Sequence, residues 1–374
     1  MDYGVQVISD ANWLSSVEPL KRKGEGVTST ASSGFSLHRG RGIILYSGMR
    51  PSSLSRWIAA FFTAVMGGIP WPEIWQSLYG SPMEDRRVYA MQVASGYLSF
   101  DVATYESPIA YITGEYLWGW VLNLLVRTIG LSADASFAVI SWFVVFTAAR
   151  VILRHAPPIY LLMLWNPIFI DLAFSQMRIA LAIAVASWAY LIRRRSGIAH
   201  TLRAIVLVAA SAMHTSAFVF IWLFIVCWHI ATRLMVRRPG LGYAALVLSG
   251  TLAAMALGPW RNAILLLIGD RRVSVEYDSS SIKFYLVWAI VLVILTIDWR
   301  EHALNALSAY SLAVLVSALM GVAVGSYSNR VIAVSLPAII VAISSISARW
   351  RSFAVLAYVG YVVIYWFYWL RLIV

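Results

Sequence analysis

Long apolar runs constrain this chain more than any other feature of its sequence. The runs at 241–259 and 304–325 reach the length of ~20 residues that a helix needs to cross a bilayer. The chain has 374 residues, of which 60% are hydrophobic and only 12% charged. The long runs also lack the alternation of membrane β-barrel strands. We therefore expect an all-α fold, a polytopic transmembrane helical bundle.

Nine segments have the length and composition of membrane helices. They lie at about 57–79, 136–152, 157–174, 177–192, 241–259, 283–297, 303–325, 331–347 and 353–370. Two further segments, 115–130 and 203–231, do not fit a simple crossing. The sequence thus predicts about nine to eleven membrane segments, with re-entrant or surface helices on the outer side, in a GT-C-like arrangement.

The basic residues predict the orientation of the bundle. The net charge is +12, and the arginines cluster between the apolar runs, which is typical of cytoplasmic loops and not of a nucleic-acid-binding surface. Residues 1–55 are polar, basic and rich in Gly and Ser, so we expect a disordered cytoplasmic tail there. Residues 56–374 then form a single transmembrane domain.

All the basic loops lie on the cytoplasmic side only under two conditions. The segment 115–130 must not cross, which predicts a re-entrant or surface-lying helix on the outer side. The segment 203–231 must enter and return as a hairpin that turns near 213–216, with short arms of about a dozen residues. The longest loops, about 80–115 and 260–282, then lie outside, where we expect the functional residues.

Two arginines begin apolar helices, where a membrane disfavours charge. Arg178 begins MRIALAIAVASWAYL, and Arg330 is placed alike in NRVIAVSLP. Either can be a snorkelling residue at the membrane interface. A guanidinium is also suited to a diphosphate, because it is planar, always charged and binds bidentately. We expect both arginines to face an outer water-filled cavity that holds an anion, with Asp171 as an alternative partner for Arg178.

Three ionisable residues are candidates for acid–base chemistry. His214 lies in the apolar stretch SAMHTSAF, either as a hydrogen-bonded packing residue or as an acid–base group. Glu115 begins the non-crossing segment, either as a charge favoured by the helix dipole or as a general base. Asp85 belongs to the sequence MEDRRVY, which is most simply a solvated loop. Alternatively, Asp85 and Glu84 form an acidic pair that holds a metal or acts on a sugar hydroxyl.

Motifs of soluble enzymes do not occur in the sequence. It has no phosphate-binding glycine loop, no HExxH, no Cys/His metal spacing and no nucleophile elbow. The tryptophans Trp118 and Trp120 suit sugar stacking, but aromatic belts at membrane interfaces explain them equally well.

The order of these residues resembles the EpsG/Wzy-like family of exopolysaccharide and capsule polymerases. That family shows an Asp–Tyr-x-x-Tyr element in an outer loop and a Glu that begins a helix. An Ile-Arg-Gln-x-Leu-Ala helix start, a His-x-Ser-Ala element and a late arginine follow. The resemblance covers about residues 57–340.

The matches and departures are specific. Asp85 and Tyr89 keep the outer-loop spacing, although Arg86 stands where the first tyrosine is usual. The sequence MRIALA places Arg178 but has Ile179 instead of glutamine. The remaining family positions match Glu115, the HTSA element that starts at His214, and Arg330.

The resemblance implies a multi-pass enzyme of the bacterial inner membrane with a cytoplasmic N-terminus. Such an enzyme joins undecaprenyl-diphosphate-linked oligosaccharide repeats at the periplasmic face, without a metal or another cofactor. Its expected partners are the lipid-linked oligosaccharide, membrane lipid and a chain-length regulator protein. Glu115 or Asp85 would deprotonate the acceptor, with His214 as a third catalytic candidate. The diphosphate would be held by Arg178, Arg330, Arg86 and Arg87.

Three other functions are compatible with the same sequence features. A GT-C-type transferase with a lipid-monophosphate sugar donor would use Glu84 and Asp85 as its acidic pair and would depend on a metal. A membrane O-acyltransferase shares the multi-helix, histidine-bearing character. A lipid-linked glycan flippase would line a path with its arginines, although the ionisable residues gather on one side and no internal pseudo-symmetry is apparent.

Overall fold

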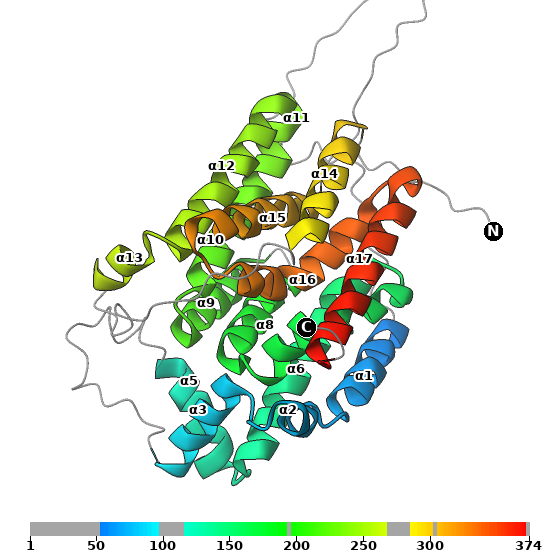
Figure 1. Cartoon of the computed structure of the whole chain (residues 1–374). Coiled ribbons are helices and arrows are strands. Elements are labelled where there is room, and N and C mark those ends of the chain that lie inside the picture. The colour runs from blue at the N-terminus through cyan, green and yellow to red at the C-terminus, as the bar shows by residue number, and fades with distance from the viewer. Residues whose placement is uncertain (1–52, 97–115, 193–195, 268–284, 302–304, 372–374) are drawn as a thin grey trace, which may run out of the picture. The chain divides into compact units, whose positions relative to one another are not determined.

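A computed structural model describes residues 53–96, 116–192, 196–267, 285–301 and 305–371. Helices make up this part of the chain, and no strand occurs within it (Figure 1). In chain order the α-helices are α1 (Ser53–Gly67), α2 (Trp71–Tyr79), α3 (Glu84–Ala94), α5 (Tyr116–Asn123), α6 (Ala133–Leu153), α7 (Pro167–Phe174), α8 (Met177–Leu191), α9 (Gly197–Met213), α10 (Ala217–His229), α11 (Met235–Arg237), α12 (Pro239–Leu257), α13 (Arg261–Leu267), α14 (Leu286–Glu301), α15 (Ala306–Val324), α16 (Ser328–Ser345) and α17 (Ala348–Trp369). The 3₁₀-helix η3 (Pro158–Leu164) precedes α7, and the π-helices η2 (Leu124–Thr128) and η4 (Ile230–Leu234) follow α5 and α10.

The helix lengths confirm an all-α protein of the multi-pass membrane class. Six helical segments in the described residues are long and apolar enough to cross a bilayer. A seventh is possible if α7 and α8, which are bent by 96° at their junction, form one broken span. The six are α6, α10 extended through α11, α12, α15, α16 and α17. This number is lower than the nine to eleven segments expected, because several apolar runs are broken.

The first expected span, 57–79, is broken into α1 and α2. The sequence Gly67-Gly68-Ile69-Pro70 separates them, because glycine weakens a helix and proline cannot donate a helix hydrogen bond. The indole Nε1 of Trp71 donates to the Met66 carbonyl oxygen at 2.9 Å across the break, where the side chain is buried. Each piece is too short to cross a bilayer alone, so the prediction of one span was wrong.

The segments 157–174 and 177–192 are likewise not two straight spans. Residues 158–164 form η3, and Asn166 then begins α7 by accepting a hydrogen bond from the Ile168 amide at 3.0 Å. The helix α7 has only eight residues and turns sharply into α8 at Ser175 and Gln176. Both segments are apolar, as expected. However, Pro158 at the start of η3, Pro167 at the start of α7 and the bend before α8 divide them into shorter elements.

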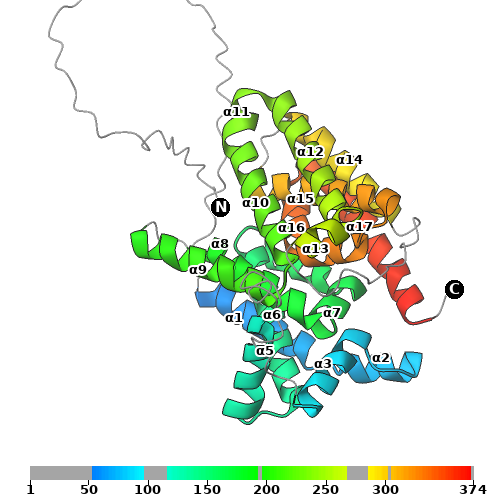
Figure 2. The same cartoon turned by 90° about the vertical axis from the view of Figure 1, so that its left-hand side faces the viewer.

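The two segments that fitted no simple crossing behave differently from each other. Helix α5 with η2 is too short to span a bilayer, in keeping with a non-crossing segment. Helix α9 ends at Met213 and α10 begins at Ala217, so the chain turns where expected. However, α10 continues through η4 and α11 into a span of 21 residues, and α9 packs mainly along α8 (Figure 2). The expected short-armed hairpin was therefore wrong.

The centre of the bundle is formed by α15 and α16. Helix α15 packs most closely against α12 and α16, and α16 also contacts α6, α7 and α17. A side chain at Gly250 of α12 would collide with the Ala313 carbonyl oxygen of α15. Small residues allow such a close approach of helices, and this packing replaces the hydrophobic effect that a membrane cannot supply.

The helix ends gather into two groups. At one end, called the basic end, Arg150 donates to the Ser55 hydroxyl at 2.9 Å and Arg154 to the Tyr190 carbonyl at 2.8 Å. The opposite end contains the first turn of α16 and the last turn of α17, and is called the cavity end for the hollow described below. Because α6 has 21 residues and α17 has 22, the two ends are ~30 Å apart at a rise of 1.5 Å per residue.

The two ends generate a labelling prediction. In a variant with Cys227→Ser, we expect a membrane-impermeant maleimide added to intact cells to label Thr128→Cys, at the end of η2 and shortly before α6. It should label Arg349→Cys, at the start of α17, only after permeabilisation. Labelling of both positions from the same side would contradict the arrangement of ends, and a reversed pattern would contradict the predicted orientation.

A buried hydrogen-bond pair generates a stability prediction. The Tyr358 hydroxyl donates to the Met163 carbonyl at 2.6 Å and accepts from the Asn166 amide at 3.0 Å, joining α17 to the segment before α7. Tyr358→Phe leaves both partners unsatisfied, so we expect a loss of about 1–3 kcal/mol and a lower Tm in detergent. Tyr160→Phe, at a hydroxyl without a hydrogen bond in the described part of the chain, is the control. Equal Tm losses would contradict the role of the pair.

Candidate functional site

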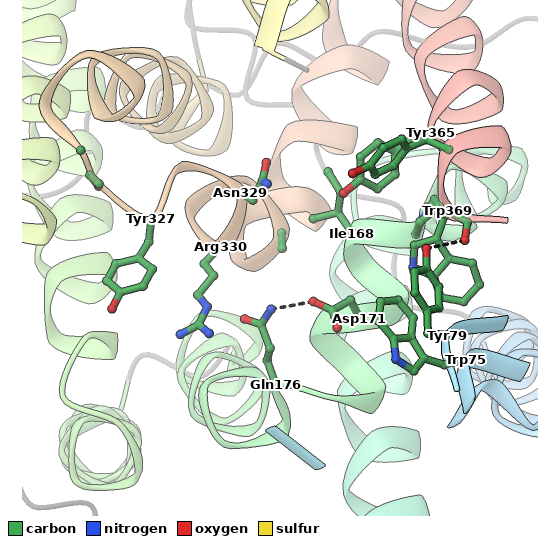
Figure 3. A pocket seen from close by; sticks show the side chains of 15 residues that line it. Trp75, Tyr79, Ile168, Asp171, Gln176, Tyr327, Asn329, Arg330, Tyr365 and Trp369 are labelled. Atoms are coloured by element: carbon green, nitrogen blue, oxygen red, sulfur yellow. Dashed lines mark hydrogen bonds between the residues drawn. The ribbon is translucent and has the colours of Figure 1, made fainter. Parts of the chain in front are cut away.

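A cavity of about 380 Å³ lies at the cavity end of the bundle (Figure 3). It is formed by α2, α7, the turn into α8, the loop between α15 and α16, the first turns of α16 and the last turns of α17. Its lining combines six aromatic side chains with one acid, one arginine and several amide and hydroxyl groups. The residues are Trp75, Tyr79, Pro167, Ile168, Asp171, Gln176, Gly325, Ser326, Tyr327, Asn329, Arg330, Ala333, Tyr365, Tyr368 and Trp369.

One side of the cavity is an aromatic wall, formed by α2 and the end of α17. Trp75 stacks on Tyr79 with ring centroids 4.1 Å apart, and Trp369 packs against Trp75 at 5.3 Å. The Tyr79 hydroxyl donates to the Trp369 carbonyl oxygen at 2.7 Å (Figure 3). The guanidinium of Arg371 covers the Tyr79 ring at 4.1 Å. The wall is thus fixed by stacking, a hydrogen bond and a cation–π contact.

The polar side of the cavity is formed at the break between α7 and α8. Gln176 Nε2 donates to Asp171 Oδ2 at 2.6 Å (Figure 3). This bond fixes the amide, because a carboxylate accepts and only the amide nitrogen can donate to it. Gln176 Oε1 therefore points away from Asp171. It is buried and has no donor among the described residues, and the same holds for the Ser326 hydroxyl oxygen.

Arg330 provides the positive charge of the cavity. It lies in the first turn of α16, and its side chain extends toward Gln176 (Figure 3). Its guanidinium lies 5.1 Å from the centre of the Tyr327 ring, and Arg261 of α13 approaches the same ring at 5.8 Å. Arg330 Nη2 lies 3.6 Å from Asp85 Oδ2. Both side chains are more than a third accessible to solvent, so this ion pair adds little stability.

Helix α3 brings Arg178 into the same neighbourhood. Asp85 and Tyr89 lie four residues apart and therefore share one face of α3. Arg330 approaches Asp85, while Arg178, in the first turn of α8, lies 5.7 Å from the Tyr89 ring centre. The two arginines that sequence reasoning paired are thus joined through one helix face. Arg330 lines the cavity, and Arg178 lies beside it.

Arg86 and Arg87 are placed differently from these two arginines. Arg86 forms an ion pair with Asp134 at 2.8 Å and covers the Phe137 ring at 4.9 Å, which attaches α3 to α6. Arg87 forms an exposed pair with Glu84 one turn earlier, and its hydrogen bond lowers the pKa of Glu84. Neither arginine lines the cavity. The neighbouring carboxylates Glu84 and Asp85 contact different arginines.

His214 lies at the turn between α9 and α10. Its Nδ1 accepts a hydrogen bond from the Ser216 amide at 3.2 Å and lies 2.8 Å from the Ser216 hydroxyl. The amide contact assigns the proton of the neutral ring to Nε2. The flanking Met213 and Ala217 pack in a buried cluster that includes Tyr89. His214 Nδ1 is thus used at the start of α10, and the neighbours of His214 pack beside Tyr89, on the face of α3 that carries Asp85.

Other residues of the predicted site lie elsewhere. Glu115 and most of both expected outer loops lie outside the described residues. Trp118 is fully buried and packs on Tyr89 at 4.9 Å, which leaves it unavailable for sugar stacking. Within the described ranges, no three His, Cys, Asp or Glu side chains lie close enough together to hold a metal ion.

Sequence reasoning missed most of the cavity lining. Asp171 was noted only as a partner for Arg178, although an acid inside an apolar run is itself a sign of function in a membrane protein. The aromatic wall combines α2 with the sequence YWFYW at 365–369. The sequence shows that each of these two segments is rich in aromatic residues, but it does not indicate that α2 and residues 365–369 pack against each other.

Comparisons with protein-family models, with curated proteins and with solved structures give no match. The relation to the polymerase family therefore depends on the quoted motifs alone. The charged groups at the cavity end are Arg330 and Asp171 in the lining, with Asp85 and Arg178 on the adjacent face of α3.

Proposed function

We propose that the protein is a membrane glycosyltransferase that polymerises oligosaccharide repeats carried on a polyprenyl diphosphate. The observation that carries the proposal is the cavity itself, in which an arginine and an acid lie beside an aromatic wall. Aromatic faces suit sugar rings, and a guanidinium suits a diphosphate. The membrane-spanning helices around it would accept a lipid tail from the bilayer.

In this proposal, Arg330 holds the diphosphate of the donor and stabilises the negative charge that develops as it leaves. Arg178 supports the same charge from beside Tyr89, and Asp85 orients the Arg330 guanidinium through their contact. The cavity end faces the periplasm, so the reaction takes place at the outer side of the bacterial inner membrane. The positive side chains would also raise the local concentration of an anionic head group.

Arg330 provides a direct test with purified protein and a synthetic prenyl-diphosphate oligosaccharide. We expect Arg330→Ala and Arg330→Lys to reduce formation of the product ladder by about 10²–10³-fold, because lysine keeps the charge but loses the bidentate geometry. Arg349→Lys is the matched control, since Arg349 also lies 5.1 Å from an aromatic ring, that of Trp350, but at the basic end. Normal ladders from both Arg330 variants would refute the diphosphate role.

Chelation gives a second test, because the proposed site stabilises the leaving group with arginine. We expect the rate of ladder formation to be unchanged, within about twofold, when the protein is treated with EDTA and the chelator is then removed. A rate that falls and returns with added Mg²⁺ or Mn²⁺ would favour the metal-dependent GT-C-type reading.

A further inference from the structure

We propose that the cavity binds the acceptor sugar and that Asp171 accepts the proton from its attacking hydroxyl group. This inference rests on the proposed glycosyl transfer and adds the acceptor site and the base. The starting observation is that the cavity lining includes the Asp171 carboxylate and Gln176 Oε1, which only accept hydrogen bonds and so cannot pair with an anionic ligand. Its charges divide into two regions, with Arg330 toward Tyr327 and Asp171 toward Trp75 (Figure 3).

The acceptors in the cavity require a ligand that donates hydrogen bonds. Asp171 lies in the lining, and Gln176 Oε1 and the Ser326 hydroxyl oxygen are buried without a donor from the described residues. Buried polar atoms of this kind are normally satisfied. A phosphate oxygen cannot satisfy Asp171 or Gln176 Oε1, since it too is an acceptor. The hydroxyl groups of a sugar can donate to all three.

The aromatic wall and the size of the cavity agree with this ligand class. Trp75, Tyr368 and Trp369 line the cavity together with the polar side chains, and sugar rings combine apolar faces with hydroxyl-bearing edges. A volume of about 380 Å³ is at the lower end of the ~300–1,000 Å³ range of ligand sites. The cavity thus fits a short part of a glycan better than a whole lipid-linked repeat.

Asp171 is better placed than Asp85 to act as the base. Asp85 is held by the Arg330 guanidinium, whose positive charge opposes proton uptake. Asp171 instead accepts hydrogen bonds from two neutral groups, the Gln176 amide, which uses Oδ2, and the Ser175 side chain. The Asp171 side chain is half-buried in the short helix α7, directly before the break. This position holds the carboxylate between the aromatic wall and the arginine.

The proposed step is balanced within the site. The acceptor oxygen forms a bond to the anomeric carbon of the donor sugar, and the bond from that carbon to the diphosphate oxygen breaks. The diphosphate leaves with the electron pair and is stabilised by Arg330. The proton of the acceptor hydroxyl moves to the carboxylate of Asp171 and is later released to water. The step needs no metal, oxidant or other co-reactant.

The test separates chemistry from acceptor binding. With purified protein, prenyl-diphosphate donor and varied acceptor oligosaccharide, we expect Asp171→Asn to lower kcat by about 10²–10⁴-fold while the acceptor KM stays within a few-fold. Asp171→Glu should recover at least about tenfold of that loss, since it restores a carboxylate. The acidic decline of the wild-type pH–rate profile should be absent from the residual activity of Asp171→Asn.

The aromatic wall gives the complementary measurement. Trp75→Phe and Trp75→Ala should raise the acceptor KM, by about tenfold for alanine, with a smaller change in kcat, because they remove stacking surface and not the base. Trp120→Ala is the control, since Trp120 is an exposed tryptophan of α5 outside the cavity. Asp134→Asn serves as the control acid for Asp171, because Asp134 is exposed and does not line the cavity.

The outcomes distinguish the two proposals. If the wild-type protein forms no product from donor and acceptor, both the proposed function and this inference fail. If the wild type is active and Asp171→Asn keeps its kcat within about threefold, with the acidic decline intact, only the role of Asp171 is overturned. If Trp75→Ala leaves the acceptor KM unchanged, the acceptor does not bind at the aromatic wall. If Asp171→Asn does not fold, Asp171→Glu decides: a rate below about 0.1% of wild type at unchanged Tm overturns the base role of Asp171, because a restored carboxylate should recover more than that.

Discussion

The need to satisfy backbone hydrogen bonds within a membrane governs this structure. A helix can break inside an apolar region only where side chains or a polar hollow accept the freed groups. The junction of α7 and α8 is such a break, and it places Asp171 and Gln176 in the lining of the cavity and Arg178 beside it. A straight helix through this segment would turn Gln176 about 140° away from Asp171, whereas at the break the Gln176 amide donates to that carboxylate. The break therefore concentrates the polar groups.

The cavity combines groups from distant parts of the sequence. Helix α2 contributes Trp75, α7 contributes Asp171 and α16 contributes Arg330. Asp85 of α3 lies outside the lining and contacts Arg330. The central packing of α15 and α16 fixes the position of Arg330, because α16 is buried along almost its whole length. The charged side chains at the cavity end thus stand on a rigid support. This suits a site that must hold a charged group in one orientation.

The sequence predicted the class of the protein but not the geometry of its cavity. Apolar length identified the multi-pass membrane class, yet it could not locate the breaks near Pro70 and Gln176, because a short apolar helix and half of a spanning helix have the same composition. The sequence placed Arg178 and Arg330 at helix starts, and in the structure each contacts the same face of α3, while only Arg330 lines the cavity. Arg86 shows the limit, since its pairing with Asp134 depends on how α3 meets α6.

The aromatic wall has a consequence for biogenesis. The Tyr79 hydroxyl and the Trp369 carbonyl that it contacts are separated by 290 positions along the chain. During synthesis, Trp75 and Tyr79 of α2 therefore lack their contacts to Trp369 until the last turn of α17 has been translated and inserted. A nascent chain consequently has no complete cavity, and any glycan chemistry there begins only when insertion has reached that point.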